Sequence, residues 1–122
     1  MTRNWEIIRE ILFKLETTTT ANTNLDANCF VGFVEQEVAY NMRLLSDAGF
    51  IEAKIMNSSS GDGKINAALA TRLTNSGHDL LDTMRNDSVW SKVKEKFVTN
   101  GIDMTFELVI SVGKKIMEAM LS

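Results

Sequence analysis

The chain has 122 residues, 44% of them apolar and 24% charged, which is the composition of an ordinary globular protein with a single core. Its formal net charge of −3 excludes a general attraction to phosphate, so any nucleic-acid binding must use a local patch. The single cysteine excludes an internal disulfide, and we expect a cytoplasmic protein with no signal peptide and no membrane span.

The first predicted element is an amphipathic helix from about Asn4 to Glu16. Its apolar stripe recurs at helical spacing through Trp5, Ile8, Leu12 and Leu15. The segment 17–28 is rich in Thr, Asn and Ala, whose side chains bury little, so we predict a loop there. The apolar run 29–34 predicts a short strand or an extended entry into the next helix, with Cys29 in the core.

A second helix and a β-hairpin are predicted next. Helical spacing of apolar residues continues from Glu35 to Ala48, and Gly49 can end the helix in a left-handed conformation. The runs 50–56 and 64–70 alternate apolar with polar residues, and a Gly- and Ser-rich segment, 57–63, separates them. These two runs therefore predict the strands of a hairpin.

Three helices complete the predicted elements. Thr74 caps the first, Asp87 or Ser88 the second, and Asp103 opens the last, while the pair Asn100-Gly101 breaks the second. The fold class is therefore mainly α with a small β-hairpin (α+β). We expect one domain over residues 1–100, with residues 101–122 as an amphipathic helix that belongs to it or dimerises.

Two segments resemble winged-helix regulators. Tyr-Asn-Met-Arg-Leu-Leu-Ser-Asp-Ala-Gly-Phe-Ile, residues 40–51, is similar to their third helix and the start of their wing. After the predicted hairpin, Leu73-Thr74-Asn75-Ser76-Gly77-His78-Asp79-Leu80-Leu81 resembles the "L-T-x-x-G-x-x-L-L" that follows the wing. The resemblance implies a winged helix-turn-helix-like fold over residues 1–100, with additional C-terminal helices.

A closer resemblance covers nearly the whole chain. Two of its motifs are Trp-Glu-Ile-Ile-Arg-Glu-Ile-Leu at 5–12 and Glu-Val-Ala-Tyr-Asn-Met-Arg-Leu-Leu at 37–45. The third is a discontinuous pattern over residues 73–94, which includes Leu73, Gly77, Arg85, Trp90 and Lys94. They are similar to the bacterial and phage family called domain of unknown function 2513. The resemblance implies a phage or prophage setting. The chain departs from the family where Asn41 stands in place of a usual histidine.

The helix 35–48 is the candidate DNA-reading element. Gln and Asn can pair with adenine, and Arg with guanine, if these side chains face outward into the major groove. Glutamates at its N-terminal end oppose the approach of phosphate. The hairpin tip could place flanking lysines on the DNA backbone. The candidate nucleic-acid-binding residues are Gln36, Tyr40, Asn41, Arg43, Lys54 and Lys64.

Two functions are compatible with these features. The first is a winged-helix DNA-binding or transcription-regulatory protein of phage or prophage origin, with double-stranded DNA as its partner. The second is a protein-binding adaptor, or a modulator of a host or defence complex, that uses the same scaffold without binding DNA. The negative net charge favours the second, whereas Gln36, Asn41, Arg43 and the lysine-flanked hairpin favour the first.

No catalytic site is expected. His78 is the only histidine, and Asp82 follows one helical turn later, but no nucleophile or second histidine accompanies the pair. We therefore interpret His78 as a hydrogen-bonding residue of the fold. The sequence predicts no metal, no cofactor and no small-molecule substrate.

The last predicted helix keeps an apolar face almost to the end of the chain. Such a face needs a partner, which is either the first helix of the same chain or the same helix of a second subunit. The second arrangement would make a homodimer, with Gly113 allowing two backbones to approach. The candidate interface residues are Phe106, Ile110, Gly113, Met117 and Met120.

Overall fold

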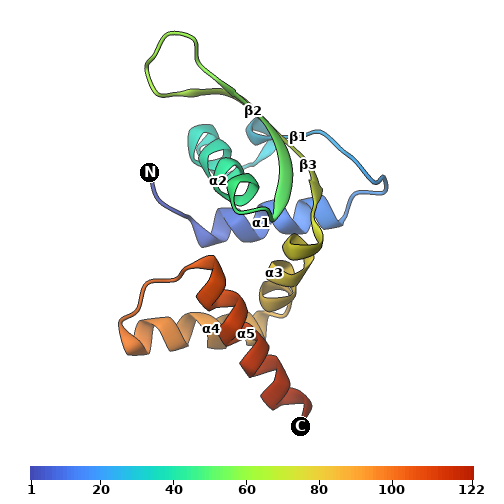
Figure 1. Cartoon of the computed structure of the whole chain (residues 1–122), viewed down its shortest axis with the longest axis vertical. Helices are drawn as coiled ribbons and strands as arrows, with labels where there is room; N and C mark the ends of the chain where they lie inside the picture. The colour runs from blue at the N-terminus through green and yellow to red at the C-terminus, as the bar shows by residue number, and fades with distance from the viewer. The chain divides into compact units, whose positions relative to one another are not determined.

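A computed structural model describes all 122 residues of the chain (Figure 1). It contains five α-helices and a three-stranded antiparallel sheet, which confirms the predicted α+β class. The chain forms two compact units, Met1–Gly77 and His78–Ser122. This division differs from the predicted one, which placed one domain over 1–100 and a helix over 101–122 that belongs to that domain or dimerises.

Helix α1 (Trp5–Glu16) opens the first unit at the predicted position. The side chain of Asn4 accepts hydrogen bonds from the backbone N–H groups of Glu6 and Ile7, at 3.1 and 3.2 Å, and so caps the helix. On the apolar face of α1, Trp5 is half-buried, and the residues from Ile7 to Leu15 that point inward are buried. The capping residue and the apolar spacing thus predict both the start of the helix and its inward face.

The prediction for residues 17–34 is wrong in where it places the strand. Strand β1 (Leu25–Asp26) and the short 3₁₀ helix η1 (Ala27–Cys29) lie in or next to the predicted loop, whereas residues 30–34 form turns. Leu25 pairs with Ala70, so tertiary pairing with β3 overrides the weak local strand preference. Cys29 is exposed instead of buried in the core.

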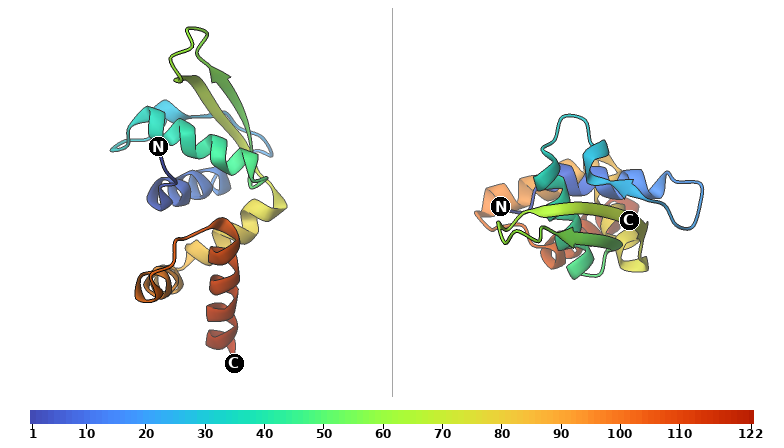
Figure 2. Two further views of the ribbon diagram at one scale, coloured as in Figure 1. Left: turned by 60° about the vertical axis from the view of Figure 1, so that its left-hand side comes forward. Right: turned by 90° about the horizontal axis from the view of Figure 1, so that it is seen from above.

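Helix α2 (Glu35–Asp47) is followed by the predicted hairpin of β2 (Ile51–Asn57) and β3 (Ile65–Leu73). The strand order is β1-β3-β2, so β3 is central and β2 lies at an edge. Along β2, exposed residues alternate with more buried ones, and α2 packs against both long strands. The hairpin tip projects beyond the helices of this unit (Figure 2).

Thr74 and Gly77 fix the junction between the hairpin and helix α3 (Asn75–Arg85). The Thr74 hydroxyl donates to the Gly49 carbonyl at 2.6 Å and accepts from the N–H of Gly77 at 3.1 Å. A Cβ atom on Gly77 would lie only 2.0 Å from the Phe50 carbonyl oxygen. Glycine is therefore required here because helix and turn backbones approach too closely for a side chain.

The second unit contains most of α3, together with α4 (Asp87–Asn100) and α5 (Phe106–Leu121). The caps differ by one or two residues from those predicted. The side chain of Asn86, not Asp87 or Ser88, caps α4, and that of Thr105, not Asp103, caps α5. Gly101 ends α4 in the left-handed region with φ 63°, as the Asn-Gly pair predicted.

Candidate functional site

Asn41, predicted to read bases, is not on the outward face of α2. It is 1% exposed. Its side-chain oxygen accepts from the backbone N–H of Asn4 at 2.9 Å, and its amide nitrogen donates to the Glu37 carbonyl at 2.8 Å. The prediction for this residue is wrong, because Asn41 is buried and its amide ties the start of α1 to the middle of α2.

Gln36 is also used within the fold. Its side-chain nitrogen donates to the Ile65 carbonyl at 2.7 Å, and its side-chain oxygen accepts from the Ile65 N–H at 3.0 Å. The Gln36 amide thus makes the same two hydrogen bonds to the backbone of Ile65, the first residue of β3, that a residue of a neighbouring strand would make. Because the amide edge is occupied, Gln36 would have to break both bonds before it could contact a base.

Tyr40 and Arg43 are the two predicted base-reading side chains of α2 that the structure brings together. Both are half-buried, and the Arg43 guanidinium carbon lies 5.3 Å from the centre of the Tyr40 ring. This distance is that of a cation–π contact. The pair leaves the guanidinium N–H groups available to a ligand, so these two residues stay candidates.

Of the two predicted wing lysines, Lys54 does not share a surface with Tyr40 and Arg43, whereas Lys64 directly precedes Ile65, whose backbone bonds to Gln36 of α2. Both lysines are exposed. The side chains of Ile51, Ala53 and Ile55 alternate with that of Lys54, so Lys54 lies on the sheet face opposite α2. Lys64 ends the hairpin turn, where its N–H donates to the Asp62 carboxylate at 2.9 Å.

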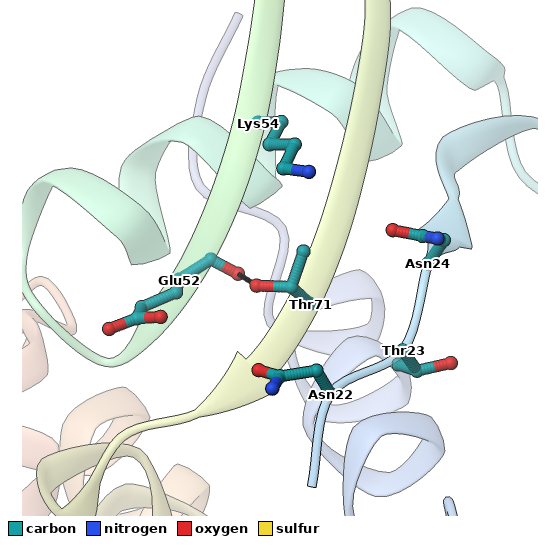
Figure 3. Close-up of a pocket in the computed structure, with 6 residues that line it drawn as sticks. All are labelled: Asn22, Thr23, Asn24, Glu52, Lys54 and Thr71. Atoms are coloured by element: carbon teal, nitrogen blue, oxygen red, sulfur yellow. Dashed lines mark hydrogen bonds between the residues drawn. The ribbon is translucent and has the colours of Figure 1, made fainter. Parts of the chain in front are cut away.

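Lys54 instead lines a small polar pocket on that opposite face (Figure 3). The pocket has a volume of about 300 Å³, and its floor includes Thr71, whose hydroxyl donates to the Glu52 carbonyl at 3.0 Å. Asn22, Thr23 and Asn24 close its other side. No group of three or more His, Cys, Asp or Glu side chains in the chain is placed to hold a metal ion.

Glu52 is the one carboxylate of this pocket, and it is in an ion pair. One of its oxygens lies 2.7 Å from a guanidinium nitrogen of Arg72 on β3. The hydrogen bond and the charge of Arg72 lower the pKa of Glu52 below its ordinary value. Glu52 is therefore held in its ionised form, which suits a structural or binding role better than that of a proton donor.

The residues at the start of α2 form a surface that the sequence analysis missed. Val31 is 96% exposed and Val34 61% exposed, whereas the intervening Phe33 is half-buried. Glu35 and Glu37 follow in the first turn of α2, both exposed and without an ion pair. We call Val31, Val34, Glu35 and Glu37 the α2 N-terminal surface. The apolar run had suggested burial, but Gly32, with φ 86°, turns the chain and leaves both valines outside.

The comparisons with known proteins give the family. Residues 2–103 match the model of the family described as "Hypothetical protein (DUF2513)". The chain belongs to this family. A Haemophilus influenzae protein described as "Uncharacterized protein" is 39% identical over 122 residues, which cover 100% of each chain. No solved structure matches. No helix combines the length and the apolar character that crossing a bilayer requires.

In this DUF2513 chain, the motif that carried the resemblance serves the fold. Thr74 and Gly77 set the start of α3, and Trp90 is buried. His78 is exposed, and Asp82 bonds to Arg85 at 3.0 Å, so the hydrogen-bonding role expected of His78 is not seen. The motif therefore identifies the family, and Thr74, Gly77 and Trp90 within it serve the fold.

The apolar stripe of α5 is only partly available for a second subunit. Gly113 is buried, and a Cβ atom there would lie 2.6 Å from side-chain carbons of Thr83 on α3. The expectation that Gly113 admits the backbone of a second subunit is therefore wrong, because Thr83 of the same chain occupies that space. Phe106, Ile110 and Met117 are half-buried, and Met120 is 50% exposed.

Proposed function

We propose that the chain is a non-enzymatic protein-binding adaptor or modulator of phage or prophage origin, and that the α2 N-terminal surface receives its partner. The observation that carries this proposal is a contrast within α2. The amides of Gln36 and Asn41 are bonded inside the fold, whereas Val31 and Val34 remain exposed beside the unpaired Glu35 and Glu37.

The proposed scaffold is winged-helix-like. Its support is the element order of the first unit, which runs from α1 through β1 and α2 to the hairpin of β2 and β3. The similarity of residues 40–51 to the third helix of winged-helix regulators adds to this. In such a scaffold, α2 and the hairpin are the elements that meet a partner.

The chemistry of the α2 N-terminal surface indicates the class of partner. A valine side chain that leaves water on binding contributes roughly 1.5–3 kcal/mol when fully buried, and Val31 gains almost none of this within the chain. The neighbouring carboxylates attract cations and repel phosphates. The surface therefore fits a protein segment that carries an apolar side chain next to lysine or arginine.

DNA binding is the second candidate, and one observation favours it. Arg43, stacked on Tyr40, leaves its guanidinium available on α2. Glu35, Glu37 and Asp47 are exposed on the same helix, so their charges oppose the approach of phosphate.

A cytoplasmic location belongs to the proposal and accords with the exposed thiol of Cys29. The homodimer predicted through α5 is not part of it, because Thr83 of the same chain occupies the space at Gly113 on which the close approach of two α5 helices depended.

The proposal can be tested by comparing two matched valine variants. Val31→Asp changes the α2 N-terminal surface, and Val98→Asp places the same charge on α4, where Val98 is 82% exposed. Neither change should alter the melting temperature by much, because neither side chain is buried. The tagged full-length parent and both variants would be cross-linked in cells of the natural host, and the captured proteins quantified by mass spectrometry.

We expect a defined protein to be captured by the parent and by Val98→Asp, and to fall at least about tenfold with Val31→Asp. Binding of that purified protein to the parent, weakened by added salt, would establish direct contact. Equal capture by all three proteins would contradict the assignment to the α2 N-terminal surface.

A further inference from the structure

Strand β2 leaves one side of the sheet unpaired. The order β1-β3-β2 places β2 at the edge, where only its β3 side is hydrogen-bonded. A cavity of about 550 Å³ lies along it, lined by the consecutive residues 51–54 of the strand and by parts of α2 and β3. An edge of this kind can accept another strand unless the sequence prevents it.

The backbone groups of β2 that face this edge can be assigned. The Phe50 carbonyl accepts from the Thr74 N–H at 3.0 Å, and the Glu52 carbonyl accepts from the Thr71 hydroxyl at 3.0 Å, so both point toward β3. Backbone direction alternates along a strand. The N–H and C=O groups of residues 51, 53 and 55 therefore face the open edge, and no backbone hydrogen bond joins them to other parts of the chain outside the sheet.

The sequence of this edge is complementary to its own reverse. Residues 51–55 read Ile-Glu-Ala-Lys-Ile, and reading backwards exchanges only the glutamate and the lysine. If two copies run antiparallel with Ala53 opposite Ala53, each Glu52 lies opposite a Lys54. The two isoleucines then also lie opposite each other. In this register, residues 51, 53 and 55 lie opposite residues 55, 53 and 51 of the second copy. These are the residues whose backbone N–H and C=O groups face the open edge, so they can form the hydrogen-bonded pairs between the two strands.

We propose that β2 is a self-association edge, along which a second copy of this chain pairs antiparallel about Ala53. The two sheets then become one continuous sheet across the dimer. Opposite charges on directly facing residues stabilise a strand pair, and like charges destabilise it. Lys54, which has no ion pair within the chain, gains Glu52 of the partner. Glu52 is exposed enough to keep Arg72 and accept this lysine as well.

A lone lysine on an edge strand is also a common protection against pairing. Here Glu52 precedes Lys54 by two residues on the same face of β2. In the register with Ala53 opposite Ala53, each lysine therefore lies opposite a glutamate and is attracted to the second copy. Any register that places Lys54 opposite Lys54, or Glu52 opposite Glu52, is disfavoured. The charge pattern thus both permits the pairing and fixes its register.

The test uses complementary charge reversals in the full-length chain. Glu52→Lys puts two lysines on each edge, and Lys54→Glu puts two glutamates there. Each variant alone should repel its own copy, but an equimolar mixture should pair, because every lysine then faces a glutamate. Glu10→Lys and Lys14→Glu are the matched controls, since this half-buried pair on α1 carries the same charges away from the edge. Sedimentation equilibrium gives the dissociation constants.

We expect the parent to approach twice its 13.6 kDa mass with rising concentration. Each β2 reversal should raise the dissociation constant by about tenfold or more, and the mixture should restore it. Circular dichroism of each variant confirms that it is folded. A parent that is monomeric at about 1 mM contradicts the proposal. So does a dimer no more sensitive to the β2 reversals than to the α1 controls, or one that Ile110→Glu on α5 abolishes while Lys54→Glu does not.

Discussion

Helix α2 and strand β2 carry residues that the sequence assigned to one DNA-binding surface, but they use them in opposite ways. On α2, the polar side chains of Gln36 and Asn41 are bonded within the fold. On β2, the assigned residue Lys54 stays exposed, and the strand edge has no neighbour. The residue type determines which hydrogen bonds or ion pairs a polar side chain can make. Its neighbours in the fold determine whether the side chain is free to make them with a partner.

The largest effect is expected from Asn41→Ala. The change leaves the N–H of Asn4 without its partner in a part-buried position and removes a link between α1 and α2. We expect a loss of about 1–3 kcal/mol in the free energy of unfolding. Urea denaturation monitored by circular dichroism measures it, and Arg43→Ala on the same helix is the control, expected to change stability by less. Equal stability of parent and Asn41→Ala would break the comparison, because the hydrogen bonds of Asn41 would then contribute nothing to holding α1 and α2 together.

A smaller effect is expected from Gln36→Ala. The variant loses two hydrogen bonds to Ile65, but the site is half-buried, so water can replace part of them. We expect a loss of about 1 kcal/mol in the free energy of unfolding. Hydrogen exchange should show faster loss of the Ile65 amide proton in the variant than in the parent. An unchanged exchange rate there would mean that the Gln36 amide does not hold the start of β3 in solution.

Lys54→Ala should leave the stability of the monomer within about 0.5 kcal/mol, because the side chain is exposed and has no ion-pair partner in the chain. Thermal melts at low protein concentration, where only monomer is present, measure this effect. A larger loss would place Lys54 with Asn41 among the residues that hold the fold, and would remove the contrast between β2 and α2.

The smallest effect concerns the pH dependence of the Glu52 and Arg72 pair. Arg72 lowers the pKa of Glu52 in the folded chain, so the stability from this pair is fully present above the ordinary carboxyl pKa. It is lost as the pH falls through the lowered pKa of the folded state. Parent and Glu52→Gln should therefore differ slightly at neutral pH, and should converge as the pH falls below the lowered pKa of Glu52. Both side chains are exposed, so added salt should reduce the difference. A difference that persists unchanged in acid would exclude ionisation as its cause.

Much of the fold could be predicted from local patterns, because they have a direct physical cause. The alternation in β2 and β3, the cap at Asn4 and the left-handed Gly101 each follow from neighbouring residues. Strand β1 could not be predicted, since Leu25 becomes extended only by pairing with Ala70, far away in sequence. Nor could the approach of Thr83 to Gly113, which depends on how two helices pack.

The candidate site was less predictable than the fold. An asparagine on a helix has the same chemistry whether it faces solvent or a neighbouring helix, so only the bond between Asn41 and Asn4 reveals its role. Val31 and Val34 show the opposite case. They belong to an apolar run, which is ordinarily buried, yet both are exposed. Gly32 is the sequence feature that could have suggested a turn at this point, because glycine readily adopts the positive φ that the structure shows there.

The most direct test of the central claim is a fluorescence anisotropy titration of labelled random-sequence duplex DNA with the full-length chain, at about 50 mM and about 200 mM salt. Our account predicts no binding at either concentration up to about 0.1 mM protein, because the exposed charges of α2 are mainly acidic and its amides are bonded internally. Binding that weakens steeply between the two salt concentrations, and that is lost when Arg43 and Lys64 are replaced by alanine, would contradict the account and establish α2 and the hairpin tip as a DNA-binding surface.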